Sequence, residues 1–100
     1  MATATKVLAR TAAATSSTTL YTVPTATTTV VTNIVVTNSA ASAATFTLTL
    51  NSVDIFTTAA IAANSTAMFD LKQVMATTEI IAGFASAVTV KFHISGVEIS

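Results

Sequence analysis

Threonine and valine restrict the backbone of this chain more than any other feature. Thr occurs 22 times and Val 11 times in 100 residues, whereas Gly occurs twice and Pro once. A side chain branched at Cβ loses rotamer freedom in a helix and packs well on the pleated surface of a sheet. The longest such run, TTVVTNIVVT at 28–37, therefore predicts a central strand covered on both faces. Its predicted faces are Val30, Ile34 and Val36 on one side, and Val31 and Val35 on the other.

Strict alternation of apolar and polar residues predicts two strands that each bury one face. In TFTLTL at 45–50, the apolar side chains share one side: Phe46, Leu48 and Leu50. The closing segment at 87–95 directs four apolar side chains toward the core: Val88, Val90, Phe92 and Ile94. Gly96 allows the chain to bend after this strand. Gly83 marks either a bulge or a close approach of two backbones.

Shorter β-type segments complete the predicted fold. Further strands are expected at 20–23, 53–57, 66–71 and 79–84. Asn51-Ser52 predicts a tight hairpin, because Asn tolerates a positive φ. Residues 59–64 predict a connection, and residues 72–78 a turn or a single helical turn. Seven or eight short strands without a long helix are typical of an antiparallel β-sandwich or jelly roll, so residues 20–100 are expected to form one all-β domain.

The first 19 residues differ in composition from the rest of the chain. The sequence MATATKVLARTAAATSSTT is low in complexity, and after Met1 its only sizeable apolar side chains are Val7 and Leu8. Such a segment cannot build a hydrophobic core alone. We therefore predict an N-terminal arm at 1–19, either a disordered tail or an arm that orders on a neighbouring subunit. A short strand around residues 6–10 is a further alternative.

The surface expected for this chain is almost uncharged. Charged residues make up 8% of the sequence and the net charge is zero, against about a quarter charged residues in an average soluble protein. Its polar faces must therefore consist mainly of hydroxyls and amides, which cost far less to bury than charges. Near-zero net charge promotes association. We interpret the chain as a subunit largely covered by neighbours, with a Thr-rich monomer as the alternative.

Two classes of partner are not expected. Four scattered basic residues are offset by four acidic ones, so no basic stripe for nucleic acid forms. No apolar run approaches the ~20 residues of a membrane span.

The residue types that catalysis and metal binding require are scarce. The chain has one His, four carboxylates and no Cys. No Gly-x-Ser-x-Gly turn presents a serine, and nothing in the sequence brings two carboxylates together for glycoside hydrolysis. A single His without Cys cannot supply the usual zinc ligands. We therefore predict no enzyme, cofactor or metal, and six candidates for interface contacts: Lys6, Val7, Leu8, Arg10, Tyr21 and His93.

Four segments carry a resemblance to a known group of proteins. They are LYTVP at 20–24, VVTNIVVTNSAASAATFTLTLN at 30–51, IAANST at 61–66 and VTVKFHISGVEIS at 88–100. Their order over most of the chain resembles small β-sandwich structural proteins of tailed-bacteriophage virions. Those proteins often have a Gly-Asp turn before the penultimate strand, where this chain has Thr77, Thr78 and Glu79.

The resemblance implies a structural virion protein, made in the cytoplasm of a host bacterium and located on the capsid surface. Its expected role is that of a capsid decoration (cement) protein, which binds and stabilises the assembled shell. Its expected partners are the major capsid protein and further copies of itself, commonly as trimers. A minor tail or head–tail junction protein is the alternative within this group. A carbohydrate-binding module for host adhesion is the alternative from another class, and it requires a row of exposed aromatic side chains.

Overall fold

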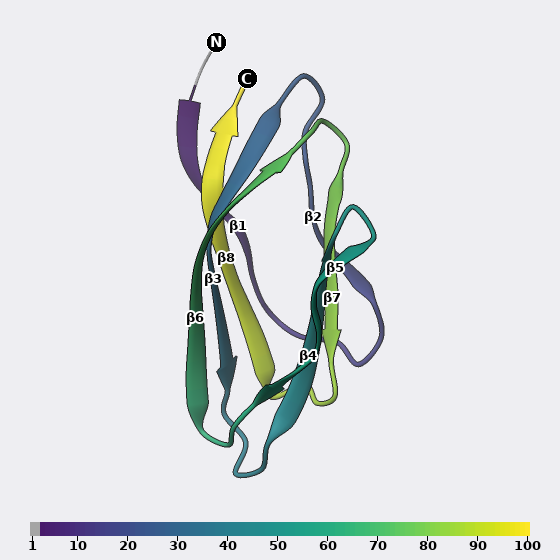
Figure 1. Cartoon of the computed structure of the whole chain (residues 1–100), viewed down its shortest axis with the longest axis vertical. Helices are drawn as coiled ribbons and strands as arrows, with labels where there is room; N and C mark the ends of the chain where they lie inside the picture. The colour runs from purple at the N-terminus through teal and green to yellow at the C-terminus, as the bar shows by residue number, and fades with distance from the viewer. Residues whose placement is uncertain (1–2) are drawn as a thin grey trace.

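The computed structural model describes residues 3–100 and contains eight antiparallel strands in two sheets (Figure 1). The strands are β1 (Thr3–Ala12), β2 (Thr18–Thr22), β3 (Thr28–Asn38), β4 (Ala44–Leu50), β5 (Val53–Ile61), β6 (Ser65–Met75), β7 (Ile80–Ala85) and β8 (Val90–Ile99). One sheet has the order β1-β8-β3-β6 and the other β2-β7-β4-β5. Successive strands alternate between the sheets except in the β4–β5 hairpin. This arrangement is that of an eight-stranded jelly roll, which confirms the predicted fold class.

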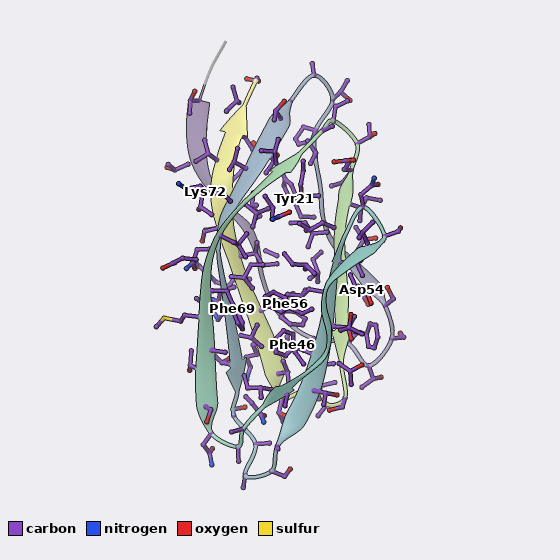
Figure 2. The ribbon with its side chains drawn as sticks, viewed as in Figure 1. Tyr21, Phe46, Asp54, Phe56, Phe69 and Lys72 are labelled. Atoms are coloured by element: carbon purple, nitrogen blue, oxygen red, sulfur yellow. The ribbon has the colours of Figure 1, made fainter. Side chains whose placement is uncertain are left out.

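Four phenylalanines hold the core between the two sheets. The ring centroid of Phe46 lies 5.5 Å from that of Phe56, 6.4 Å from that of Phe69 and 6.2 Å from that of Phe92. Phe46 and Phe56 belong to one sheet, and Phe69 and Phe92 to the other. Figure 2 shows three of these rings meeting between the layers. Aromatic pairs at these separations add attraction beyond their buried area, so the cluster joins the two sheets.

The inner faces predicted for 45–50 and 87–95 are largely confirmed. Phe46 and Leu48 are buried and Leu50 packs against the core. In β8 the buried side chains are those of Val90, Phe92 and Ile94. Val88 is an exception at 62% exposed, because it lies in the turn before β8 begins.

A bulge at Thr32 alters the faces predicted for the central strand. β3 does lie between β8 and β6, as expected. However, Thr32 is an extra residue against β8, since Val31 pairs with Gly96 and Asn33 with Ser95. A bulge shifts the alternation of inward and outward side chains. The residues that share the buried face are therefore Val31, Ile34 and Val36. The predicted assignment of Val30 to that face is wrong, and Val30 and Val35 remain partly exposed on the outside instead of being covered.

The tight hairpin predicted at Asn51-Ser52 is confirmed. Leu50 pairs with Val53, and both turn residues have positive φ angles of 51° and 65°. The predicted connection at 59–64 and turn at 72–78 are each shorter than expected, because β5 continues to residue 61 and β6 to residue 75.

The two glycines lie inside strands where neighbouring atoms approach closely. β8 runs through Gly96 without a bend. The position requires glycine for another reason, because a Cβ here would overlap the carbonyl oxygen of Val30 on β3. At Gly83 a Cβ would lie 3.0 Å from the backbone carbonyl oxygen of Thr47 on β4, which agrees with the close backbone approach predicted there.

The N-terminal segment forms part of the sandwich, which corrects the expected separation of an arm at 1–19 from a domain at 20–100. β1 pairs with β8 from Thr3 with Ile99 to Ala12 with Lys91, and Leu8 is only 6% exposed. Composition underestimates this segment because strand pairing uses backbone N–H and C=O groups, which nearly every residue carries. Met1 and Ala2 of the predicted arm lie outside the described residues.

Candidate interaction surface

Acidic side chains are engaged separately in this fold. Asp54 accepts a hydrogen bond from Thr57 (2.8 Å), and Asp70 accepts one from Asn33 (3.2 Å). Within residues 3–100, no three side chains of His, Cys, Asp or Glu are placed to hold a metal ion together. Nor does the described part of the chain include a helix whose length and apolar character would allow it to cross a membrane.

A polar cluster around Glu98 connects the two sheets. Tyr21 of β2 donates its hydroxyl hydrogen to Glu98 of β8, and its oxygen lies 2.8 Å from the hydroxyl of Thr29 on β3. Lys6 of β1 forms an ion pair with Glu98, with 3.3 Å between Nζ and Oε2. Figure 2 shows Tyr21 in the space between the layers. The cluster therefore ties β2 to three strands of the opposite sheet.

These contacts shift the pKa values of both acidic groups. The hydrogen bond from Tyr21 lowers the pKa of Glu98, assisted by Lys6 and opposed by desolvation. Burial, together with the hydrogen bond to Glu98, raises the pKa of Tyr21 to about 12. Glu98 is therefore ionised and Tyr21 protonated across the neutral pH range.

We expect this cluster to lose its stabilising effect at both ends of the pH scale. The pKa of Glu98 is lower in the folded state, so its contribution is complete above its ordinary pKa of 4.5 and is lost as pH falls through the folded value. Tyr21 has a raised pKa, so its contribution is complete below pH 10.0 and is lost between 10.0 and about 12. Urea unfolding at a series of pH values measures both effects.

Two single variants separate the contributions of this cluster. The unfolding free energy of Glu98→Gln should fall less in acid than that of the unmodified chain. The unfolding free energy of Tyr21→Phe should fall less in alkali. Each should lower the free energy of unfolding at neutral pH by about 1–2 kcal/mol. If both variants kept the full pH dependence of the unmodified chain, the cluster would not be its source.

Exposed apolar side chains gather on the outer side of the β1-β8-β3-β6 sheet. Residues paired across neighbouring strands share a face, and the registers align Arg10, His93, Val35 and Met68 in one row across all four strands. The next two outward-facing rows of paired residues, in the direction of Val97, add four valines to this surface. We call this surface the valine face and define it by six side chains: Val7, Val30, Val35, Met68, Val74 and Val97. Three of them are strongly exposed, namely Val7 (46%), Met68 (74%) and Val74 (70%).

The structure brings three of the six predicted interface candidates together on this face. Val7, Arg10 and His93 all point outward, because β1 and β8 are paired. Lys6 and Tyr21 instead contact Glu98 within the same chain. The structure corrects the prediction for Leu8, whose side chain is buried in its own core and is not accessible to a partner.

Val74 and Met68, the two most exposed members of the valine face, were not among the interface residues predicted from the sequence. Val74 lies in a segment that was expected to form a turn, whereas β6 extends through it. Met68 alternates with Phe69, and this was the available signal that it faces outward.

Two open depressions flank Thr32 on this side of the sheet. One, of about 360 Å³, is lined by residues that include Thr5, Val7 and Val97. The other, of about 430 Å³, is lined by Thr32, Asp70, Leu71 and Lys72. Neither lining includes an aromatic side chain, so the face is better suited to a broad protein contact than to a sugar ring.

Comparison of the chain with protein-family models, with curated proteins and with solved structures finds no match. The geometry by itself defines a jelly-roll β-sandwich whose distinguishing surface is the valine face. Any function has to be inferred from that surface and from the rest of the exterior.

Proposed function

We propose that this chain is a non-enzymatic structural subunit of a larger assembly, and specifically a capsid decoration protein of a tailed-bacteriophage virion. The observation that carries the proposal is a nearly uncharged exterior with exposed apolar side chains on several surfaces. Apolar patches on a soluble protein mark sites of interaction. Besides the valine face, three apolar side chains are exposed elsewhere: Val53 (69%), Ile80 (37%) and Val88 (62%).

These additional positions support contacts in more than one direction. Val53 follows the Asn51-Ser52 turn, and the backbone N–H of Asn51 donates to the carbonyl of Ile80. Val88 lies beyond the other end of β7. A decoration protein needs several such surfaces, because it contacts both the major capsid protein beneath it and copies of itself.

The mechanism that we propose is mass action on the capsid surface. A subunit that binds the assembled shell, and not its free components, stabilises the shell in proportion to its affinity and concentration. Many weak contacts repeated over one particle then act together. A folded sandwich with uncharged faces suits this role, because burial of Thr and Ser hydroxyls costs much less than burial of charges.

Placement of the aromatic side chains does not favour the carbohydrate-binding alternative. Phe46, Phe56, Phe69 and Phe92 form the cluster between the sheets. Tyr21 is engaged with Glu98 and Thr29. Phe84 is partly buried and points outward from β7, but it is a single ring. A sugar-binding surface would need such rings exposed in a row, so we rank this function below a structural one.

Counting copies per particle separates the capsid role from the tail role. We expect quantitative mass spectrometry of purified phage particles to give hundreds of copies, because a decoration protein repeats over the shell. A few copies, or a few tens, would instead identify a minor tail or head–tail junction protein. Comparison with the major capsid protein in the same sample provides the internal standard.

A further inference from the structure

We propose that the valine face is a two-fold interface through which two copies of this chain pack sheet against sheet. The inference goes beyond attachment to a capsid and does not depend on it. Between the six apolar side chains of the face lie Thr5, Asn33 and Ser95, which are uncharged, and Asp70, whose carboxylate accepts a hydrogen bond from Asn33. The uncharged positions lose little on desolvation and the valines gain from burial, whereas Asp70 needs a basic partner on the second copy.

The edges of the sheets are poorly suited to association. Each of the four edge strands carries at least one extra residue relative to its partner: Leu8 in β1, Leu20 in β2, Ile55 in β5, and one of residues 71–72 in β6. A bulge interrupts the regular ladder of N–H and C=O groups that an added strand would need. Contact between copies is therefore directed to a face.

The outer side of the β1-β8-β3-β6 sheet, of which the valine face is a part, is large enough for a specific contact. Four strands about 4.8 Å apart, with about ten residues rising about 3.3 Å each, give a surface of roughly 600 Å². Two copies packed face to face would bury roughly 1,200 Å² in total, which reaches the lower end of specific protein interfaces.

Charges at the two edges of the face complement those of a second copy. Arg10 lies on edge strand β1, and Asp70 lies on the opposite edge strand β6, in adjacent rows. A two-fold axis parallel to the strands places β1 of each copy over β6 of the other. The contact between Arg10 and Asp70 is then made twice, as in any isologous interface. Lys72 lines the same depression as Asp70 and offsets part of its charge. We therefore expect the contact between Arg10 and Asp70 to govern the orientation of the two copies more than their affinity.

The geometry favours pairs of chains over the trimers that the resemblance implies. An isologous contact between two identical faces is complete with two copies and leaves no equivalent surface for a third. The molar mass of the purified chain in solution therefore distinguishes the two arrangements.

The test compares two valines of equal exposure. Val74 is 70% exposed on the valine face and Val53 is 69% exposed away from it. We expect light scattering to give twice 10.2 kDa for the unmodified chain and for Val53→Asp. Val74→Asp should raise the dissociation constant at least tenfold and shift the mass toward a single chain, because it buries a charge in the interface. Both sites are exposed, so circular dichroism should show both variants folded.

Charge exchange provides a second measurement. Arg10→Asp should weaken the dimer, because it places two acidic side chains opposite each other. Adding Asp70→Arg should restore the dimer, because an acidic and a basic side chain then meet again across the two-fold axis. The proposal is overturned by an unmodified chain that has the mass of one or of three copies at about 100 µM, a concentration well above a micromolar dissociation constant. It is equally overturned if Val74→Asp and Val53→Asp dissociate the dimer alike. These measurements use the chain alone, so their failure leaves capsid binding as a separate question.

Discussion

Replacing Phe92 with alanine should lower the free energy of unfolding by about 3–5 kcal/mol. Phe92 has no exposed surface, and its ring lies 6.2 Å from that of Phe46 in the opposite sheet. Truncation removes these contacts and leaves a cavity between layers that cannot close fully. A small domain is stable by only about 5–15 kcal/mol in total, so the variant should unfold at a much lower urea concentration.

Phe84→Ala is the matched control for this prediction. Phe84 is only partly buried and points to the outside of the β2-β7-β4-β5 sheet, where it is paired with Thr47. Its removal should cost about 1 kcal/mol. A loss below about 1 kcal/mol for Phe92→Ala itself would contradict the inward orientation of this face of β8.

Gly96→Ala should destabilise the domain by about 3 kcal/mol, although it adds a single methyl group. The new Cβ would overlap the carbonyl oxygen of Val30 and lie 3.0 Å from Cδ1 of Leu8. The carbonyl belongs to the backbone of β3 and cannot rotate away. β8 and β3 would have to separate within a pairing that runs from Thr28 with Ile99 to Asn38 with Val90. Urea unfolding monitored by circular dichroism measures the loss.

Gly83→Ala tests whether the effect comes from the backbone contact. A Cβ at Gly83 would lie 2.6 Å from Cδ2 of Leu48, which can change rotamer, and 3.0 Å from the carbonyl oxygen of Thr47. This variant should therefore be less destabilised than Gly96→Ala. The reverse order would be incompatible with the close pairing of β8 and β3 at Gly96.

Regular alternation made much of the fold predictable. Phe46 and Leu48 in β4, and Phe92 and Ile94 in β8, are buried as their period of two residues indicated. Alternation did not indicate the buried face of β3, where one residue is inserted. Val30 and Val31 are adjacent and equally apolar, so nothing in their sequence shows that the bulge at Thr32 turns Val31 inward.

Contacts between distant segments were less predictable. Tyr21 and Glu98 are 77 positions apart, and neither residue alone indicates the other as its partner. β1 was underestimated for a related reason, since its pairing with β8 depends on backbone groups. That pairing also places Arg10 beside His93. Both were proposed as contact residues from their chemistry, but their common location required the fold.

The number of copies of this chain in purified phage particles tests whether the chain is a structural subunit of the virion. Quantitative mass spectrometry should detect the chain in particles that remain after extensive washing, at hundreds of copies relative to the major capsid protein. That result would establish a structural subunit of the shell. Absence of the chain from every particle fraction would contradict the virion assignment, whatever its fold and oligomeric state.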